Sequence, residues 1–283
     1  MSRDSKGILY VVATPIGNLD DITLRALKTL KAVALVAAED TRRTGILLRH
    51  FGLETPILSV HEHNEHTRIA RVASHLVKGE SVALVTDAGT PGISDPGATL
   101  VGAIRKAGFR VEPIPGASAV AAAISASGVN SHGFTFLGFP PIRSKDRKRW
   151  LESLVSGAQD RLVVFFEAPH KVKKTLEELS LLVKRPIIIG REITKIHEEF
   201  VEGLPGELLT RFDSPQGEFT VMIPPPDPAE KAMEPASDED VMELFGQITD
   251  SGEGGSKRDV ARLVGERLGM TAKQVYEIVE RNK

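Results

Sequence analysis

The segment from Thr86 to Gly97, Thr-Asp-Ala-Gly-Thr-Pro-Gly-Ile-Ser-Asp-Pro-Gly, has the composition of a ligand-binding loop. Its small residues and two prolines expose backbone amides and carbonyls on a rigid chain, which is how many proteins hold small molecules. Ser94 or Asp95, followed by Pro96, predicts the start of a helix. A plain junction between a strand and a helix does not need so elaborate a loop, and we expect this one to bind a ligand.

Two more loops of small residues follow apolar runs that predict strands. They are Ala13–Leu19 and Pro115–Ala119. Small side chains let a flat ligand approach the backbone closely. The first loop is equally consistent with a plain strand-to-helix turn, and Ser118 with a simple helix cap. Neither loop has the G-x-G-x-x-G or G-x-S-x-G pattern, so they predict neither a dinucleotide cradle nor a hydrolase nucleophile.

Histidines gather at His61, His63 and His66, with acidic residues between them. No regular helix or strand brings three of these side chains to one face, and the H-E-x-x-H pattern of zinc enzymes is absent. We therefore predict no metal site. The segment is better interpreted as a polar loop facing a substrate or as a solvated helix start.

Basic residues are concentrated in two places. Arg42 and Arg43 follow an acidic pair at an expected helix start, where cations are unfavourable unless an anion compensates them. A local salt bridge to Glu39 or Asp40 is the simpler alternative. The second concentration ends at Trp150 and consists of Arg143, Lys145, Arg147, Lys148 and Arg149. Such a segment suits contact with nucleic-acid phosphates, which we favour, although a solvated helix face has the same composition.

The loops need a scaffold, and apolar runs alternate with amphipathic stretches through most of the chain. Strands are predicted at Ile8–Ala13, Val33–Ala37, Val82–Val85, Val111–Ile114, Phe134–Leu137, Leu162–Phe166, Pro186–Ile189 and Phe219–Ile223. This alternation predicts an α/β fold in which the strands deliver their carboxyl ends to the ligand-binding edge. Each domain is expected to be a largely parallel or mixed sheet flanked by helices, with a small helical module at the C-terminus.

Changes in composition divide the 283 residues into four parts. A small-residue stretch at Gly128–Gly133 separates two halves, and prolines at Pro224–Pro228 end the sheet pattern. We expect an N-terminal α/β domain at 7–130, a second α/β domain at 131–224, an acidic proline-rich linker at 225–236 and a helix–turn–helix-like tail at 237–283. The tail leaves Lys273 outward, which suits either nucleic-acid contact or a docking module.

The composition excludes several classes of protein. The absence of cysteine rules out a disulfide scaffold, a thiol nucleophile, an iron–sulfur cluster and cysteine-ligated zinc. No apolar run approaches the roughly 18–20 residues of a membrane helix and no signal peptide is present, so we expect a cytoplasmic protein with no membrane partner. The net charge of −2 hides an acidic stretch at residues 225–255 and a weakly basic remainder. Any contact with nucleic acid must therefore come from local patches.

Five of these segments together resemble one known family. They are Leu9–Leu19, Ala38–Arg42, His61–Glu65, Asp87–Gly97 and Gly190–Lys195. They occur in the order found in the tetrapyrrole methylase superfamily, specifically in its bacterial members that methylate small-subunit ribosomal RNA, and the likeness runs from Ile8 to Ile223. The corrin-making members have Gly-Asp-Pro where Gly89-Thr90-Pro91 stands here, which argues against a tetrapyrrole substrate.

The resemblance implies a two-domain tetrapyrrole methylase-like fold that forms a homodimer and binds S-adenosylmethionine in the cleft between its domains. The implied substrate is the ribose 2′-hydroxyl of a cytidine in small-subunit (16S) rRNA, either free or within the ribosomal subunit. By position, the residues implied to contact the cofactor are Pro15, Ile16, Asp87, Gly89, Thr90, Ile93, Ser118, Ala119, Phe166, Glu218, Phe219 and Thr220. The basic residues named above, together with Lys273, become candidates for RNA binding.

Such a reaction needs positioning more than covalent catalysis. A sulfonium methyl is already a strong electrophile, so the enzyme mainly has to hold the hydroxyl and the methyl group in line. A neutral hydroxyl is a weak nucleophile and benefits from a proton acceptor. For that role we select Lys195, Glu192 and His197, which follow the strand predicted at Pro186–Ile189. Lys195 would need a lowered pKa to act as a base, although in its charged form it could hold a phosphate.

Two other functions are compatible with the sequence. One is methylation of a tetrapyrrole or another small molecule on the same scaffold, which would need neither the basic segment nor the tail. The other is RNA binding in ribosome assembly without catalysis, which would need no methyl donor.

Overall fold

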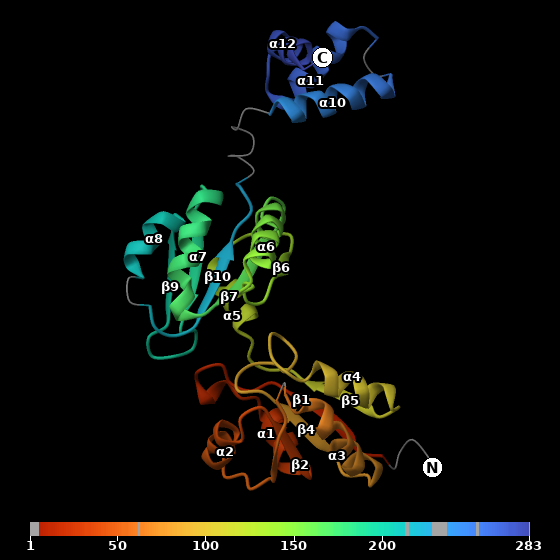
Figure 1. Cartoon of the computed structure of the whole chain (residues 1–283), viewed down its shortest axis with the longest axis vertical. Helices are drawn as coiled ribbons and strands as arrows, with labels where there is room; N and C mark the ends of the chain where they lie inside the picture. The colour runs from red at the N-terminus through yellow and green to blue at the C-terminus, as the bar shows by residue number, and fades with distance from the viewer. Residues whose placement is uncertain (1–5, 62, 213–214, 228–236, 253–254, 283) are drawn as a thin grey trace. The chain divides into compact units, whose positions relative to one another are not determined.

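The computed structural model describes residues 6–61, 63–212, 215–227, 237–252 and 255–282. The chain divides into two compact units, Met1–Pro225 and Pro226–Lys283. Within the described residues, the first unit contains two five-stranded sheets, each covered by helices, and the second unit contains helices (Figure 1).

The elements alternate in the order expected of an α/β chain. The strands are β1 (Ile8–Val12), β2 (Leu35–Ala38), β3 (Ile57–Ser59), β4 (Val82–Val85), β5 (Arg110–Ile114), β6 (Phe134–Phe136), β7 (Leu162–Glu167), β8 (Ile187–Arg191), β9 (Glu199–Gly203) and β10 (Phe219–Ile223). The helices of the first unit are η2 (Leu19–Asp21, a 3-10 helix), α1 (Leu24–Ala32), α2 (Thr41–His50), α3 (Glu65–Val77), α4 (Ala98–Lys106), α5 (Ala119–Ser127), α6 (Ser144–Gly157), α7 (Pro169–Leu182) and α8 (Pro205–Arg211).

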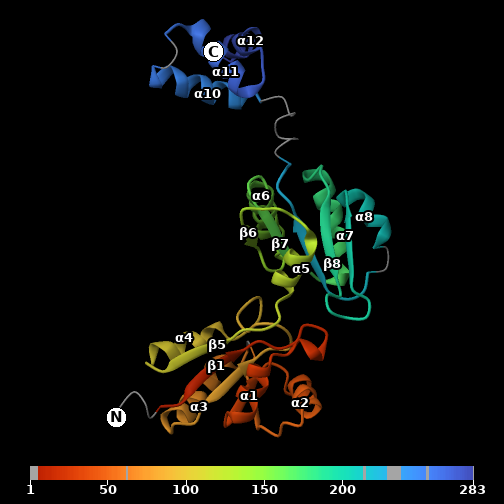
Figure 2. The ribbon, with the colours of Figure 1, turned by 180° about the vertical axis from the view of Figure 1, so that it is seen from behind.

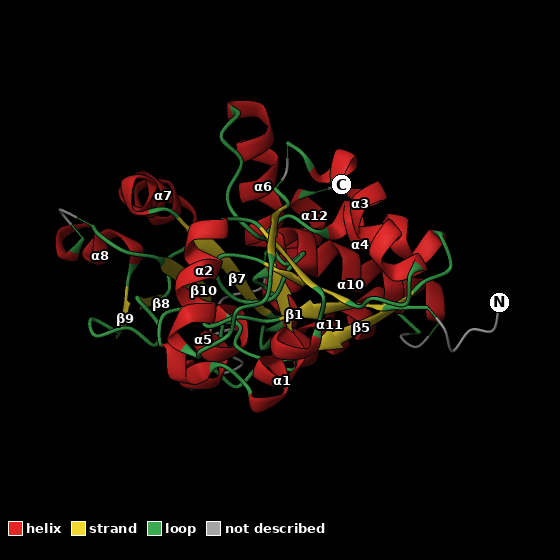
Figure 3. Ribbon diagram, turned by 90° about the horizontal axis from the view of Figure 1, so that it is seen from below, coloured by secondary structure: helices red, strands yellow, loops and turns green. Residues whose placement is uncertain are grey.

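The first sheet is entirely parallel, with the strand order β3-β2-β4-β1-β5. Every residue of β2 and β4 is buried, as expected of parallel strands that are covered on both faces. One face packs on α3 and α4 around Leu84, and the other packs on α1 and α2 around Val85. Figure 3 shows these two pairs of helices on opposite sides of β1. The central strands β4 and β1 therefore end side by side at one edge.

The second sheet is mixed, with the order β6-β7-β10-β8-β9. Strands β6 and β7 are parallel, whereas β10 runs antiparallel to both of its neighbours. Helices α6, α7 and α8 pack on the face that carries Phe165. Helix α5 packs on the other face against Val164 and Met222 (Figure 2). We call the first sheet with its helices the first lobe and the second sheet with its helices the second lobe. Because α5 packs in the core of the second sheet, the chain passes from the first lobe to the second before α5, whereas the sequence places this helix in the N-terminal domain at 7–130.

The second unit contains α10 (Asp238–Ser251), α11 (Lys257–Leu268) and α12 (Ala272–Arg281), which bury a core of their own. Each helix begins at a capping box, and in α12 the Thr271 side chain accepts the backbone N–H of Gln274. Gly269 adopts φ +67° between α11 and α12, a conformation that favours glycine at a helix end. Among the described residues, every helix is too short or too polar to pass through a lipid bilayer.

The prediction of an α/β fold with helix-flanked sheets and a C-terminal helical module is confirmed. Two strands were not predicted. Strand β3 has only three residues, and β9 is an edge strand that carries Glu199 and Glu202 among its five residues. Both lack the apolar run by which a strand can be predicted.

Candidate active site

The loop after β1 and the loop between β4 and α4 (residues 86–97, the β4–α4 loop) form a single wall. Thr14 and Gly89 exchange both backbone hydrogen bonds, with N···O distances of 2.9 and 3.1 Å. The Thr14 hydroxyl also donates to the Thr86 carbonyl oxygen at 3.2 Å. Gly89 has φ +74°, so a glycine is favoured where the loop turns to meet Thr14. These contacts explain why β1 and β4 each end in a loop of small residues.

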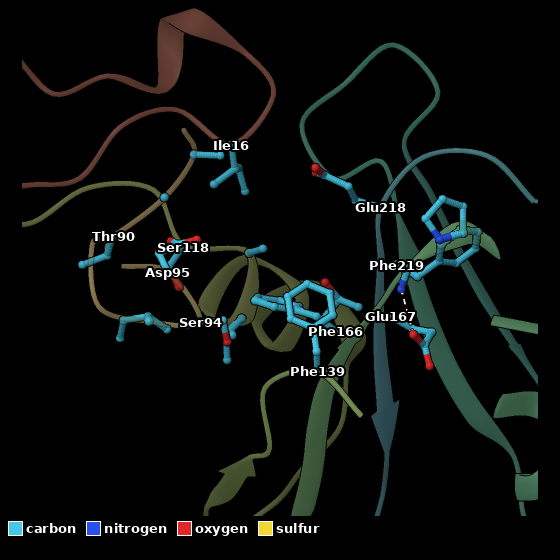
Figure 4. Close-up of a pocket in the computed structure, with 18 residues that line it drawn as sticks. Ile16, Thr90, Ser94, Asp95, Ser118, Phe139, Phe166, Glu167, Glu218 and Phe219 are labelled. Atoms are coloured by element: carbon cyan, nitrogen blue, oxygen red, sulfur yellow. Dashed lines mark hydrogen bonds between the residues drawn. The ribbon is translucent and has the colours of Figure 1, made fainter. Parts of the chain in front are cut away.

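A cavity of about 320 Å³ separates this wall from the edge of the second sheet at which β7 ends and β10 begins (Figure 4). Its volume lies in the range of about 300–1,000 Å³ that is common for small-molecule sites. The lining residues are Ile16, Ala88, Gly89, Thr90, Ile93, Ser94, Asp95, Ser118, Ala119, Val120, Phe139, Phe166, Glu167, Ala168, Pro169, Glu218, Phe219 and Thr220.

The lining combines aromatic rings with backbone polar groups. Phe139 and Phe166 lie in contact, with ring centroids 5.5 Å apart, and both border the cavity. Helices α5 and α7 begin at the cavity with Ser118–Ala119 and Ala168–Pro169 respectively. A helix start offers backbone N–H groups and a partial positive charge. A flat ring system with polar edges, such as a nucleoside, matches this lining.

Three non-glycine residues with φ in the left-handed region are found among the described residues; the first borders the cavity and the other two lie in the loop after β8. They are Ser94 (φ +63°), Glu192 (φ +51°) and Thr194 (φ +68°). A β-branched residue such as threonine is strained in this region. Strained backbone persists only where surrounding contacts impose it, and it clusters at functional sites.

The loop after β8 carries a compact ion-pair network. Lys195 Nζ donates to Glu192 Oε1 at 2.8 Å and to Glu218 Oε2 at 3.1 Å. Glu192 Oε1 also accepts the backbone N–H of Glu218 at 2.9 Å. Gly217 allows this approach, because a Cβ there would lie 2.4 Å from the Glu192 carboxylate. The network fixes the loop against the start of β10, where Glu218 borders the cavity.

This network argues against Lys195 as a base. Partial burial lowers the pKa of Lys195, but the hydrogen bonds and charges of Glu192 and Glu218 outweigh that effect and leave the pKa above its ordinary value. For Glu192, partial burial is likewise outweighed, mainly by the hydrogen bond from Lys195, and its pKa is lowered. Lys195 therefore stays charged at neutral pH and Glu192 is a weaker base than usual. Neither residue lines the cavity, nor does the exposed His197.

A group of carboxylates lies on the first-lobe side of the cavity. Burial raises the pKa of Asp95 to about 6, and the negative charges of Glu39, Asp87 and Glu218 add to this against a weak opposing hydrogen bond from Thr86. Burial also raises the pKa of Glu39 above its ordinary value, and the nearby Asp87 charge acts in the same direction.

The acid pair Glu39–Asp40 has different partners on its two residues. The Arg42 side chain donates to Asp40 and holds the pKa of that carboxyl at about 2, while Asp40 caps α2 through the Arg42 backbone N–H at 2.8 Å. Arg43 faces Asp87 at 3.5 Å. The local salt bridge considered for Arg42 is thus present, and the exposed remainder of both arginine side chains stays accessible.

Most of the residues implied to contact the cofactor line this cavity. Ile16, Gly89, Thr90, Ile93, Ser118, Ala119, Phe166, Glu218, Phe219 and Thr220 all border it. Pro15 is buried and Asp87 is directed to Arg43 and to the backbone of Asp40, so neither borders it. The residues implied to contact the cofactor did not include Ala88, Ser94, Asp95, Val120, Phe139, Glu167, Ala168 and Pro169, although the first three belong to the segment 86–97 that was expected to bind a ligand. Pro169 at the start of α7 was a usable signal, because proline is favoured at the first position of a helix.

One expected RNA contact is wrong. Arg147 is only 7 % exposed, and its guanidinium donates to Glu178 Oε2 and to the Thr175 hydroxyl, each at 2.7 Å. Its helix face also carries Trp150, which packs edge-on against Phe165 at 5.0 Å. A side chain with these partners is not available to a phosphate.

The other basic candidates are exposed. Arg143, Lys145, Lys148 and Arg149 lie on the solvent side of α6. In the C-terminal unit, Lys273 is 85 % exposed and borders a shallow hollow that also contains Lys257, Arg258 and Tyr276. Lys257 and Arg258 were not selected from the sequence, although a basic pair at a helix start was a visible signal.

Two residues of the histidine-containing segment, Asn64 and Glu65, have an architectural role on the first lobe. The buried Glu65 accepts the backbone N–H of Leu100 at 2.6 Å and so caps α4, whose preceding residue, Gly97, has no side chain for the purpose. Asn64 accepts the backbone N–H of His61 at 2.9 Å. In the described ranges, no group of three or more histidine or acidic side chains is placed to hold a metal ion. Glu65 thus anchors the end of the β4–α4 loop.

Comparison with known proteins gives consistent matches. Residues 8–209 match the family described as Tetrapyrrole (Corrin/Porphyrin) Methylases. A protein of Synechocystis named ribosomal RNA small subunit methyltransferase I is 40% identical over 276 residues, which cover 96% of this chain and 97% of that protein. A Thermotoga maritima protein of the same name is 45% identical over 220 residues, or 77% of this chain and 98% of that protein. About a quarter of this chain therefore has no counterpart in the Thermotoga protein.

Solved structures of similar fold are more distant in sequence. A cobalt precorrin-4 methyltransferase of cobalamin biosynthesis gives a TM-score of 0.58 at 18% identity, covering 78% of this chain and 97% of that chain. A Thermus thermophilus uroporphyrin-III C-methyltransferase, solved in complex with S-adenosylhomocysteine, gives a TM-score of 0.55 at 17% identity, covering 76% and 96%. At this level of identity the likeness establishes the fold alone.

Proposed function

The chain belongs to the tetrapyrrole (corrin/porphyrin) methylase family, and we propose that it transfers the methyl group of S-adenosylmethionine to the ribose 2′-hydroxyl of a cytidine in small-subunit rRNA. The observation that carries this proposal is the cavity where the loops after β1 and β4 meet the edge of the second sheet. Relatives at 40–45% identity, named as methyltransferases of small-subunit rRNA, support the substrate class.

The cavity has the features that the methyl donor would need. Ile16, Phe139 and Phe166 offer apolar surface for an adenine ring, and Ala88, Gly89 and Ala119 leave the backbone open to hydrogen bonds. Carboxylates on both sides of the cavity favour a positively charged sulfonium. When bound, the donor supplies an activated methyl group, and the residues of the protein supply orientation and exclude water.

An RNA substrate fits the charge distribution around the cavity. Phe139 lines the cavity, and the exposed basic face of α6 begins a few residues later with Arg143. Phosphates that contact Arg143, Lys145, Lys148 or Arg149 would hold an RNA segment close to the cavity mouth. Arg42 and Arg43 are exposed near the same edge. An rRNA substrate also implies a cytoplasmic site of action.

The tail and the quaternary structure are separate proposals. Lys257, Arg258 and Lys273 with Tyr276 form a second basic surface, which we assign to RNA as well. The Thermotoga relative matches only 77% of this chain, so the part without a counterpart would add affinity and would not be needed for the chemistry. The homodimer implied by the sequence resemblance stays a prediction, which sedimentation of the full chain would test.

A methyl-transfer assay on the full chain tests the proposal. The protein is incubated with S-adenosylmethionine carrying a labelled methyl group and, in separate reactions, small-subunit rRNA, assembled small subunits and a mixture of porphyrinogens. Label in 2′-O-methylcytidine supports the proposal, and label in a tetrapyrrole contradicts it. Calorimetry with S-adenosylmethionine, and with an Ala119→Trp variant whose cavity is filled, separates a catalyst from an RNA-binding assembly factor, which would bind no donor.

A further inference from the structure

The loop after β8, residues 192–198, carries two neighbouring exposed side chains. Ile196 is 97 % exposed, the highest value among the large apolar residues that the structure describes, and His197 beside it is exposed as well. We call these two residues the loop tip. Single apolar residues on a surface are common and indicate nothing by themselves. The loop tip differs from them in the strained shape of its loop and in the place where that loop is anchored.

Hydrogen bonds within the loop fix its backbone. Thr194, whose φ of +68° is strained for a β-branched residue, donates its backbone N–H to Glu198 Oε2 at 2.6 Å. The backbone N–H of Glu198 donates to the Lys195 carbonyl oxygen at 3.0 Å, which closes a turn with Ile196 and His197 at its centre. Strained backbone persists only where such contacts impose it. The loop tip is therefore presented to solvent from a fixed backbone.

The loop is anchored to both lobes beside the cavity. Lys195 Nζ donates to Glu218 Oε2 at 3.1 Å, and Glu218 borders the cavity from the second lobe. From the first lobe, the backbone N–H of Asn18 donates to Thr194 Oγ1 at 3.1 Å, and Ile16, two residues earlier in the chain, borders the cavity (Figure 4). The loop tip follows directly after Thr194 and Lys195. A ligand that extends from the cavity past this loop would therefore meet the loop tip.

The chemistry of the loop tip suits the face of a nucleobase. Isoleucine is among the apolar side chains that proteins insert between stacked bases, and histidine is among the rings on which unpaired RNA bases stack. A second protein chain is a less suitable partner. A standard subunit interface buries about 800 Å² of each partner, whereas the residues that flank the loop tip, Lys195 and Glu198, are charged. The loop tip therefore fits a single base better than a protein surface.

The proposed reaction creates a need for such a contact. A nucleotide in a continuous strand is stacked between its neighbours, and its ribose reaches a donor inside a cavity of about 320 Å³ only after the nucleotide turns out of the stack. The neighbouring base then loses a stacking partner. A fixed apolar and aromatic surface beside the cavity can replace that partner at little cost in loop ordering.

On the basis of the proposed function, we propose that the loop tip is an RNA-contact element. Ile196 and His197 stack against the base next to the target cytidine and hold the strand open while the ribose of the cytidine lies in the cavity. The contact changes no covalent bond and transfers no proton. His197 acts by stacking, in place of the proton acceptor expected from the sequence, and the basic face of α6 holds the phosphates.

Methyl transfer by variants of the full chain tests the contact. We expect Ile196→Ser and His197→Ala each to lower kcat/KM for small-subunit rRNA at least about fivefold, the lower end of the usual cost of losing one stacked base. His197→Phe keeps an aromatic face and should stay within about twofold of the unmodified chain, as the loss of a proton acceptor would not allow. Calorimetry should give an affinity for S-adenosylmethionine within about twofold, because neither residue is among those described as lining the cavity.

Leu181→Ser is the matched control. Leu181 is an apolar residue of the same lobe, 76 % exposed, near the end of α7. Helix α7 begins at the cavity with Pro169, and the rise of a helix places Leu181 about 18 Å further along its axis. This variant should keep the kcat/KM of the unmodified chain. A loss as large as that of Ile196→Ser would overturn the assignment, because the effect would not depend on position.

Photocrosslinking identifies the partner of the loop tip directly. The full chain, with a benzophenone amino acid at position 196, is irradiated with small-subunit rRNA and S-adenosylhomocysteine. We expect the crosslink to map to a nucleotide adjacent to the cytidine that the unmodified chain methylates. A crosslink to a second copy of the chain, or to RNA remote from that cytidine, would overturn the assignment.

The stacking assignment and the proposed function fail differently. If the unmodified chain methylates a cytidine of rRNA while both loop-tip variants keep its kcat/KM within about twofold, the stacking assignment is wrong and the proposed function stands. If the unmodified chain transfers no methyl group to rRNA, the proposed function is wrong and the stacking assignment falls with it.

Discussion

The backbone N–H of Asn18 donates to the Thr194 hydroxyl at 3.1 Å, and this hydrogen bond joins the loop after β1 in the first lobe to the loop after β8 in the second. Gly17 stands beside it. A Cβ on Gly17 would lie 2.5 Å from Lys195 Cγ, 2.7 Å from Thr194 Oγ1 and 3.0 Å from the Ile193 carbonyl oxygen. The two loops therefore approach to a distance that only a glycine at position 17 permits.

Replacing Gly17 by alanine should separate these loops. The added Cβ meets backbone as well as side-chain atoms, so the second-lobe loop must shift, and the adjacent Ile16 would move away from the cavity. We expect affinity for S-adenosylmethionine to fall about tenfold or more with little change in thermal stability. Calorimetry and thermal unfolding of the same sample measure both.

Gly102→Ala is the matched control. Gly102 lies within α4, and a Cβ there would meet no atom within 4 Å. Alanine is a better helix former than glycine by about 1 kcal/mol, so the control should keep its affinity and gain slightly in stability. Equal donor affinity in both variants would contradict the role given to the close approach at Gly17.

Lys195→Ala should weaken binding of the RNA with little effect on the methyl-transfer step. Its pKa is raised by Glu192 and Glu218, so that Lys195 is charged throughout pH 6–9 and can attract a phosphate but cannot take a proton. We expect KM for rRNA to rise by roughly tenfold with a steeper loss at high salt. The rate of methyl transfer at saturating RNA should stay nearly unchanged; a large fall of that rate at unchanged KM would restore Lys195 as a candidate base.

Substitutions of Arg147 and Arg149 should affect different properties, the stability of the fold in the first case and RNA binding in the second. Arg147→Ala leaves Glu178 and Thr175 without their buried partner, and we expect a loss of about 3 kcal/mol in the free energy of unfolding. Arg149→Ala, on the exposed side of the same helix, should change stability by less than about 0.5 kcal/mol. It should instead weaken RNA binding and reduce, by about one, the slope of the logarithm of RNA affinity against the logarithm of salt concentration, as expected for the loss of one phosphate contact. Denaturant unfolding and RNA titration at several salt concentrations would show the opposite pattern if the assignment were wrong.

The ionised Asp95 side chain should destabilise the folded protein above about pH 6. Its folded-state pKa is raised, so the protein holds the protonated form, and the resulting stability is present below pH 4 and lost as the pH rises through about 6. Asp95→Asn avoids this loss. We expect it to be more stable than the unmodified chain at pH 8 by about 1–2 kcal/mol after allowing for solvent screening, and equal to it near pH 4. Chemical unfolding at the two pH values checks this; a variant less stable at pH 8 would contradict it.

Much of the cavity lining could be predicted from the sequence because the main wall consists of loops that follow parallel strands of one sheet. Loops that follow β1, β4 and β5 lie at one sheet edge whenever the strands are parallel, so Ile16, Gly89 and Ser118 could be placed together without a structure. Phe139 and Glu167 come from a mixed sheet whose strand order, with β10 inserted between β7 and β8, has no signature in the sequence. Asp95 was interpreted as a helix start, and its charge environment depends on residues up to 123 positions away.

Three features that the sequence interpretation misplaced or did not assign differ in how far the sequence could have revealed them. Arg147 could have been assigned correctly, because it shares a helix face with Trp150 and Leu154 at spacings of three and seven. The role of Glu65 could not, since it caps a helix 35 residues away. The lobe to which α5 belongs was equally hidden, because a short apolar helix can pack on either neighbouring sheet.

Mass mapping of nucleosides in small-subunit rRNA is the most direct measurement of the central claim that this cavity serves ribose methylation of rRNA. RNA from cells that carry the gene is compared with RNA from cells that lack it, and from deletion cells supplied with the unmodified chain or with Ala119→Trp. We predict that one 2′-O-methylcytidine disappears on deletion and returns with the unmodified chain but not with the filled cavity. Identical maps with and without the gene would contradict the account.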